Sequence, residues 1–203
     1  MYREIDKPTV DKAIADLVEP GASVFDIGCG DGSLLDQLIR RKGVKAQGLD
    51  IKARAVLACL DKGIPAIHGD LDTALGHCRD HMYDYVILSR TLQVLPSPHG
   101  VLKEIVRIGK KAIVAFPNFG HVSIRAFLMF RGRMPKSRVL PYEWYDSPNI
   151  HHLTVRDFRE FCRKHGIEIL KRAYFGRNML RRTRLAFPNL LAHEALFVIR
   201  KRA

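Results

Sequence analysis

The stretch SVFDIGCGDG at residues 23–32 decides the fold class of this 203-residue chain. Its first five residues form a short, mostly apolar run typical of a β-strand, and three glycines follow within the next five positions. A glycine-rich turn between a strand and a helix leaves the first helix amides unpaired and lets a ligand approach the backbone closely. We therefore expect residues 28–32 to form a strand-to-helix turn at a ligand site.

Short apolar runs alternate with amphipathic segments on both sides of this turn. Apolar side chains at helical spacing predict helices over residues 10–18, 34–39, 53–61 and 101–108. Apolar runs predict strands over residues 23–27, 46–51, 65–68, 83–88 and 111–116. Strands that alternate with helices and have no polar, solvent-exposed face are typical of a parallel sheet covered on both sides. The sequence therefore predicts an α/β fold with a doubly wound sheet.

The chain beyond residue 116 follows a different pattern. Residues 117–148 combine four prolines with aromatic and basic residues and show no clean period, which predicts a lid or binding loop. Thr154 fits the N-cap of a helix over residues 155–165 that Gly166 stops. Residues 167–175 and 195–200 are predicted to be the last two strands, as an antiparallel pair.

Composition excludes several classes of protein. The chain has 34 Lys and Arg against 21 Asp and Glu and is 47% hydrophobic, which excludes a disordered or fibrous chain. Its apolar runs are about a quarter as long as the roughly 20 residues of a membrane helix, so no bilayer-spanning segment is predicted. The first residues, MYREIDK, mix both charge signs and do not resemble a secretory signal, so we expect a cytoplasmic protein.

The cysteines and histidines do not predict a metal site. Cys29, Cys59, Cys78 and Cys162 lie 30, 19 and 84 positions apart, which offers neither a CxxC pair nor a disulfide framework. His151 and His152 are adjacent, and adjacent side chains rarely converge on one metal ion. We expect reduced, mostly buried thiols.

Three aspartates at predicted strand ends indicate the kind of ligand. Asp50 lies 20 residues past Gly30, where a carboxylate can accept hydrogen bonds from both hydroxyls of a ribose. The dinucleotide fingerprint would place its third glycine at Ser33, so pyrophosphate binding is disfavoured. Asp26 favours an ammonium group over phosphates, and Asp70 can receive the exocyclic amine of adenine. The three acids together suit a ligand with an ammonium group, a ribose and an adenine.

Successive motifs now support a family resemblance. VFDIGCGDG at 24–32, GLD at 48–50, GDLD at 69–72 and YDYVILS at 83–89 resemble class I S-adenosylmethionine-dependent methyltransferases. FPNFGH at 116–121, RGRMP at 131–135 and LPYEWYDSPNIH at 140–151 resemble the MetW family of methionine biosynthesis proteins. The resemblance implies a seven-stranded sheet with an antiparallel last strand and S-adenosyl-L-methionine or S-adenosyl-L-homocysteine as the cofactor. It also implies a link to MetX, the homoserine O-acyltransferase, but no known methyl acceptor.

On this basis we expect one domain, 1–203, in three parts. These are a cofactor-binding half at 1–116, a lid, acceptor or partner segment at 117–153, and a C-terminal helix with strands at 154–203. The predicted cofactor-binding residues are Asp26, Gly28, Cys29, Gly30, Gly32, Asp50, Ile51, Asp70, Leu71, Ser89 and Gln93. The bland alternative is that the three acids only solvate loops or cap helices.

His121, Tyr145 and His151 are the candidates for acid/base work in the lid, and a structural hydrogen-bonding role is the alternative for each. The lid itself fits an acceptor pocket or a partner-docking surface equally well. Methyl transfer from a sulfonium needs mainly in-line placement, and it needs a base only if the acceptor must lose a proton. The lack of an obvious catalytic dyad therefore decides nothing about turnover.

Three functions remain open. The leading one is an S-adenosylmethionine-binding MetW-type protein that acts with or activates homoserine O-acyltransferase, and the second is a small-molecule methyltransferase. RNA modification is the third, because residues 103–203 carry 22 basic and 7 acidic residues against 12 and 14 in residues 1–102. No appended RNA-binding module is visible, and the arginines of residues 156–163 also fit a solvated or partner-facing helix stripe, which disfavours nucleic acid.

Overall fold

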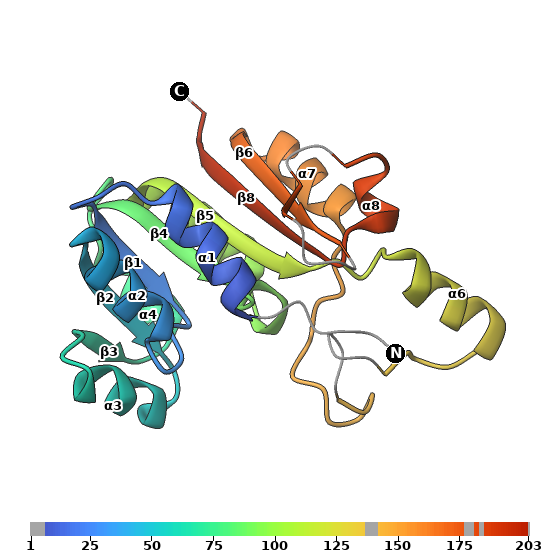
Figure 1. The fold of residues 1–203 in the computed structure, drawn as a ribbon, viewed down its shortest axis with the longest axis horizontal. Helices are drawn as coiled ribbons and strands as arrows, with labels where there is room; N and C mark the ends of the chain where they lie inside the picture. Colours follow the sequence, from blue (N-terminus) through green and yellow to red (C-terminus); the bar gives the residue numbers. More distant parts are fainter. Residues whose placement is uncertain (1–6, 137–141, 177–180, 183–184, 203) are drawn as a thin grey trace.

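The computed structural model describes residues 7–136, 142–176, 181–182 and 185–202 (Figure 1). Its helices are α1 (Lys7–Leu17), α2 (Ser33–Lys42), α3 (Ala53–Asp61), α4 (Leu71–Gly76), the 3-10 helix η1 (Leu92–Val94), α5 (Pro98–Ile108), α6 (Val122–Arg131), α7 (Val155–Lys164) and α8 (Pro188–Leu191). Its strands are β1 (Ser23–Ile27), β2 (Lys45–Asp50), β3 (Ala66–His68), β4 (Tyr83–Ser89), β5 (Gly109–Pro117), β6 (Ile167–Phe175), β7 (Arg181–Arg182) and β8 (Glu194–Lys201).

All of these strands join one sheet in the order β3-β2-β1-β4-β5-β8-β6-β7. The first five in this order pair in parallel, whereas β8 is antiparallel to both β5 and β6. The predicted doubly wound sheet of seven strands with an antiparallel last strand is therefore confirmed, and the two-residue β7 extends its edge beside β6. The predicted antiparallel pairing of the last two long strands is also confirmed.

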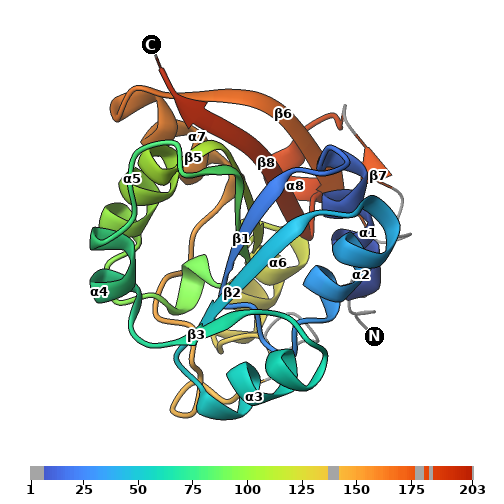
Figure 2. The ribbon, with the colours of Figure 1, turned by 90° about the vertical axis from the view of Figure 1, so that its left-hand side faces the viewer.

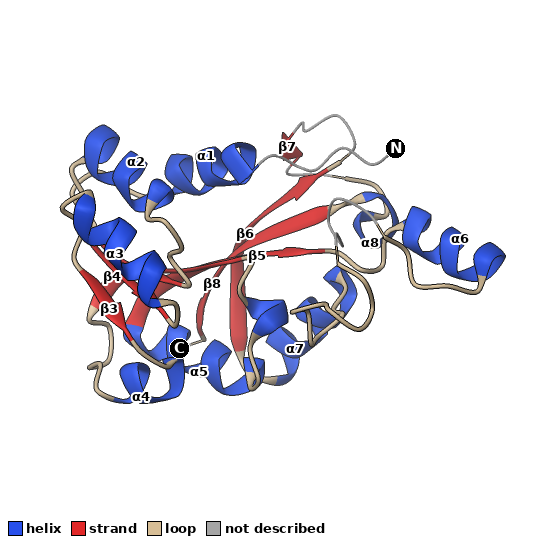
Figure 3. Cartoon of the chain, turned by 90° about the horizontal axis from the view of Figure 1, so that it is seen from below, coloured by secondary structure: helices blue, strands red, loops and turns tan. Residues whose placement is uncertain are grey.

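Helices cover both faces of the sheet, with α1, α2 and α3 on one face and α4, α5 and α7 on the other (Figures 2 and 3). Each strand contributes side chains to the cores on both faces of the sheet, because successive side chains point to opposite faces. In β1, Phe25 and Ile27 join the core under α5 and α7, while Val24 joins the core under α1 and α2. The apolar runs of the sequence arise from this two-sided burial.

The predicted helix caps are present. Thr154 Oγ1 accepts a hydrogen bond from Asp157 N, and the Asp157 side chain accepts one from Thr154 N, which is a complete capping box at the start of α7. The helix ends at its C-cap residue His165, and Gly166 follows at φ +64°. This left-handed conformation favours glycine.

The segment predicted to be an irregular lid differs from the expectation in one respect. Residues 122–131 form helix α6, which extends from the end of the molecule beyond the carboxyl end of β5 (Figure 1). The remainder, up to residue 136 and from residue 142, is mostly without regular structure, and residues 137–141 lie outside the described part. Among the described helices, none has the length and apolar character needed to cross a bilayer.

Candidate functional site at the carboxyl edge of the sheet

The residues predicted to bind a cofactor gather where the parallel strands end. Asp26 is the second-last residue of β1, Asp50 ends β2, and Ser89 ends β4. Asp70 follows β3 and opens α4, because its carbonyl oxygen accepts a hydrogen bond from Ala74 N at 3.1 Å. Since β3, β2, β1 and β4 are consecutive in a parallel sheet, these ends lie side by side along one edge.

The glycine turn is joined to the end of β2 by backbone hydrogen bonds. Gly28 N and Cys29 N both donate to Leu49 O, at 2.7 and 3.1 Å. Gly30 N donates to Asp50 Oδ2 at 3.0 Å. The predicted spacing of 20 residues thus corresponds to a direct contact between the turn and the carboxylate.

The three glycines of this turn are required for different reasons. A Cβ on Gly28 would lie 2.4 Å from Thr91 Oγ1, and a Cβ on Gly32 would lie 2.8 Å from Cys59 Sγ. Around Gly30, by contrast, nothing lies within 4 Å of such a Cβ. Gly28 and Gly32 are therefore needed for packing within the protein, and only Gly30 presents backbone to open space.

Asp50 keeps acceptor capacity beyond its contacts inside the protein. Its Oδ1 accepts from Lys52 N at 2.9 Å and its Oδ2 from Gly30 N, so two of about four lone-pair positions are used. Ile51, the next residue, is 69% exposed, and its carbonyl oxygen is 3.0 Å from His68 Nε2. An oriented carboxylate beside an exposed apolar side chain suits a ribose with an attached base.

The other two aspartates differ in burial. Asp26 is only 3% exposed, so its charge acts from beneath the glycine turn. Asp70 is exposed, and Leu71 packs against the core under α4 and α5. The backbone of Asp70 thus begins a helix, as the structural alternative expects. A role of its side chain in binding the cofactor stays a prediction.

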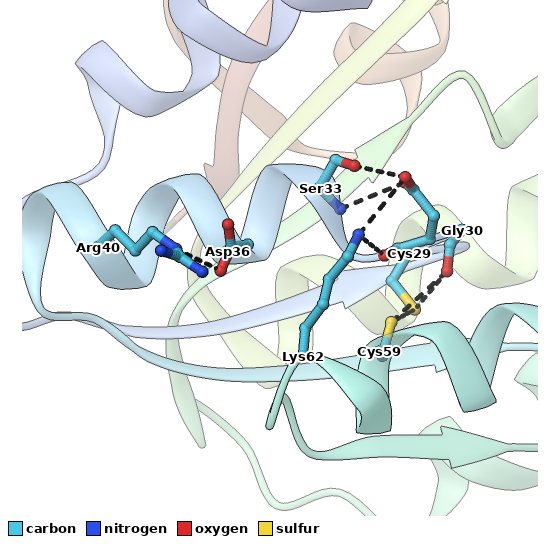
Figure 4. A network of polar contacts seen from close by, with 8 residues as sticks. Cys29, Gly30, Ser33, Asp36, Arg40, Cys59 and Lys62 are labelled. Atoms are coloured by element: carbon cyan, nitrogen blue, oxygen red, sulfur yellow. Dashed lines mark hydrogen bonds and ion pairs between the residues drawn. The ribbon is translucent and has the colours of Figure 1, made fainter.

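Two buried thiols and an exposed lysine brace the turn (Figure 4). The Sγ atoms of Cys29 and Cys59 lie 3.7 Å apart, and both thiols contact Gly30 O. Burial raises the pKa of each thiol, so both stay protonated and can donate these hydrogen bonds. Lys62 Nζ contacts both the carbonyl oxygen and the carboxylate of Asp31. The Cys29 side chain therefore supports the turn and is not presented to a ligand.

The rim after β4 is built around an ion pair between the partly exposed Arg90 and the buried Glu194. Arg90 adopts φ +57° and its Nε and Nη2 atoms donate to the two carboxylate oxygens of Glu194, both at 2.9 Å. The Glu194 side chain is 4% exposed. Thr91 Oγ1 lies within hydrogen-bond distance of Ile27 O and Ser89 O, at 3.2 and 3.1 Å. These contacts fix the ends of β1, β4 and β8 relative to one another.

Gln93 continues this rim and connects it to the lid segment. Its Nε2 donates to Arg90 O at 2.7 Å, while its Oε1 is buried without a hydrogen-bond partner among the described residues. Its carbonyl oxygen accepts from Ile150 N and His151 N, at 2.9 and 3.0 Å. His151 is thereby attached to the rim, and its own Nε2 also lacks a hydrogen-bond partner within the described part of the chain.

The three acid/base candidates do not converge. His121 is the N-cap of α6, where its Nδ1 accepts from Ser123 N at 3.1 Å, and its ring lies 3.8 Å from that of His193. Burial, with a smaller effect of His193, lowers the pKa of His121 to about 4. Tyr145 is 73% exposed and stacks edge-on against Trp144. No hydrogen bond or ring contact joins His121, Tyr145 and His151 in the described structure, and their catalytic role stays a prediction.

Sequence reasoning missed the residues that hold the rim. Arg90 and Glu194 are 104 positions apart, so no local pattern connects them. The available signal was Glu194 itself, a lone acid directly before the apolar run of β8. In the described residues no cluster of three or more potential metal ligands occurs.

Comparison with known proteins connects this site to a family. The sequence pattern of the family described as "Methionine biosynthesis protein MetW" matches residues 10–199. The chain belongs to the MetW family. A bifunctional methionine biosynthesis protein MetXA/MetW from Rhodopirellula baltica is 32% identical to this MetW-family chain over 159 residues, which are 74% of the chain and 26% of that relative.

Other relatives and structures are methyltransferases by name. A ubiquinone biosynthesis O-methyltransferase from Pectobacterium carotovorum is 29% identical over 115 residues, 54% of the chain and 47% of that protein. The MetW-family chain thus spans about a quarter and about half of these two relatives. The crystal structure of a SAM-dependent methyltransferase from Archaeoglobus fulgidus matches with a TM-score of 0.68 at 14% identity, covering 97% of this chain and 95% of that one. At this identity the likeness establishes a methyltransferase fold.

Proposed function

We propose that this chain binds S-adenosyl-L-methionine or S-adenosyl-L-homocysteine and acts in methionine biosynthesis with a MetX-type homoserine O-acyltransferase, which it assists or activates. The observation that carries the cofactor part is the hydrogen bond from Gly30 N to Asp50 Oδ2, which orients an acid with spare acceptor capacity beside open backbone. A cytoplasmic location would accord with this role.

The residues at this edge of the sheet fit the proposed cofactor. Asp50 would accept hydrogen bonds from the two ribose hydroxyls, Ile51 would lie against the adenine ring, and Asp70 would receive its exocyclic amine. Asp26 would attract the ammonium group. Backbone at Gly28–Gly32 would line the site on one side, and Ser89 and Gln93 would border it on the other. When bound, S-adenosylmethionine, unlike S-adenosylhomocysteine, would supply a methyl group on a sulfonium.

The proposed partner rests on the bifunctional relative. Its name joins MetXA and MetW in one protein, and the matched region is about a quarter of that protein. Linking two modules in one chain favours their association by raising the effective concentration. We assign cofactor binding to residues 1–116 and contact with an acceptor or the partner to residues 117–153. Residues 154–203 would complete the sheet and contribute to partner contact.

The cofactor test compares two aspartates. Calorimetric titration with S-adenosylmethionine should show binding to the wild type and about 10- to 100-fold weaker binding to Asp50→Ala, because hydrogen bonds to a charged group contribute about 1.5–3 kcal/mol. Asp36→Ala is the matched control, because Asp36 lies on α2 in a partly exposed pair with Arg40. Equal binding by all three proteins would contradict the assignment of Asp50.

The partner test uses the purified homoserine O-acyltransferase of the same organism. Its acyl-transfer rate is measured alone, with this chain, and with this chain plus S-adenosylmethionine. We expect a stable complex and a changed rate on addition of the chain. An unchanged rate together with no complex would remove the proposed partnership.

A small-molecule methyltransferase is the second candidate, and the O-methyltransferase relatives favour it. His121 is poorly suited to take a proton from an acceptor, because its Nδ1 caps α6 and its pKa is lowered to about 4. An acceptor that needs no base, or one served by His151, fits better. This candidate predicts formation of S-adenosylhomocysteine with some metabolite and loss of that turnover in Asp50→Ala.

A further inference from the structure

Helix α6 carries apolar side chains on opposite sides, with Arg125 and Arg131 between them, and yet is mostly exposed. None of its ten residues is buried, and Met129 and Phe130 are 74% and 76% exposed. At 100° per residue, Val122, Phe130 and Phe127 fall on one side of the helix, and Ile124 and Leu128 fall on the other. Apolar side chains on opposite sides of a helix are normally enclosed by protein. Among the described residues, none buries those of α6.

Within the described part of the chain, the hydrogen bonds that hold the helix lie at its start. His121 caps it, and Arg125 Nε donates to Gly120 O at 2.7 Å. Beyond this first turn α6 extends away from the sheet and its covering helices (Figures 1 and 3). It ends at Gly132, whose φ of +58° turns the chain back. The apolar side chains near its end are therefore presented outward on a fixed helix.

The surroundings of α6 are basic. No acidic residue occurs in the sequence between Glu104 and Glu143. Exposed cations at the helix and just beyond it are Arg125, Arg131, Arg133 and Lys136, of which Lys136 pairs with Glu143. An apolar surface with a basic rim is complementary to an apolar groove with an acidic rim.

Three kinds of surface could cover the exposed side chains of α6, and two of them fit poorly. A second copy of this chain would bring two basic rims together, and like charges repel. A lipid surface suits a helix with one apolar and one polar face, whereas α6 is apolar on opposite sides. A groove on a protein partner can enclose the helix from several sides.

We propose that α6 is the element by which this chain docks to its acyltransferase, inserting Met129 and Phe130 into an apolar, acid-rimmed groove of that enzyme. The inference rests on the proposed function, because the bifunctional MetXA/MetW relative is what identifies the partner. Contiguous exposed apolar patches on a folded chain commonly mark such interaction sites.

The test measures the affinity of the purified acyltransferase for three forms of the full chain. The double variant Met129→Glu/Phe130→Glu places two charges on α6. Leu57→Glu/Leu60→Glu is the matched control, because these leucines are 60% and 50% exposed on helix α3 at the other end of the molecule. All four residues are exposed, so melting temperatures should stay near that of the wild type. We expect at least about tenfold weaker binding for the α6 variant and wild-type binding for the α3 variant.

The outcomes separate this inference from the proposed function. If the wild type binds and the α6 variant binds equally well, the docking role of α6 is wrong and the partnership stands. If the wild type does not bind, both are wrong. Vesicles of anionic phospholipid provide the last comparison: retention of the wild type and not of the α6 variant on vesicles, with unchanged acyltransferase binding, would assign α6 to a membrane and overturn the inference.

Discussion

Gly28 illustrates how one residue of the site serves the fold rather than the ligand. Its φ of +76° is left-handed, and an added Cβ would meet Thr91 Oγ1 at 2.4 Å and Thr91 Cγ2 at 2.9 Å. The contact couples the turn after β1 to the turn after β4. The carboxyl edge of the sheet is therefore held in shape by close packing between two strand ends before any ligand is present.

This contact yields a double-mutant prediction. Gly28→Ala should lower the free energy of unfolding by about 2–4 kcal/mol, which combines left-handed backbone strain with overpacking. In a Thr91→Ala background the same change should cost only about 1–2 kcal/mol, because the strain remains and most of the clash is removed. Urea unfolding of the four proteins measures the coupling. Equal costs in both backgrounds would show that Thr91 does not restrict position 28.

The sequence predicted the positions of some site residues and not the contacts of others. The position of Asp50 beside the turn followed from its spacing to Gly30, because a strand, a helix and a strand of ordinary length return the chain to the same edge. The separate reasons for Gly28 and Gly32 could not be predicted, since each depends on a side chain, Thr91 or Cys59, from a distant segment. The pairing of Arg90 with Glu194 was missed for the same reason.

Elements with a clear period were predicted well, and α6 was not. Helix α7 has apolar residues on one face and a capping box, so its start could be located from Thr154. Helix α6 carries apolar side chains on opposite sides, and its N-cap is a histidine, which is not among the preferred capping residues. Its sequence therefore lacks both signals on which helix prediction depends.

The histidine cap of α6 predicts a dependence of stability on pH. A folded-state pKa of about 4 lies below the ordinary value of 6.5, so the unfolded chain binds this proton first. Stability from His121 is therefore complete above about pH 6.5 and is lost as the pH falls toward 4, by up to about 3 kcal/mol. Protonation would also turn the Nδ1 acceptor of the cap into a donor.

His121→Asn is the matched variant, because asparagine caps helices without titrating. The measurement is urea unfolding of both proteins at pH 7.5, 5.5 and 4.5. The wild type should lose more stability than the variant across this range, since other titrating groups are common to both proteins. Parallel losses in the two proteins would show that His121 titrates normally in the folded state.

At the scale of the whole molecule, one sheet combines strands from the two halves of the chain, which differ in charge and in sequence pattern. Strand β8 comes from the basic C-terminal part, yet it lies between β5 and β6 and six of its eight residues are buried. The alternation of strands and helices predicted the parallel half. The antiparallel direction of the last strand was implied by family resemblance, whereas its insertion between β5 and β6 was not predicted.

Removing β8 should therefore destabilise the protein far more than replacing α6, although each change affects ten residues. Removing residues 194–203 takes away β8, leaving β5 and β6 with exposed edges and the cores on both faces open, so the protein should lose its cooperative thermal transition. Replacing residues 122–131 with a Gly/Ser linker of equal length removes a helix with no buried residue, so the melting temperature should fall by only a few degrees. Differential scanning calorimetry of both variants measures this. A collapse of the second variant would mean that α6 is part of the fold, and its apolar surface would then need no partner to explain it.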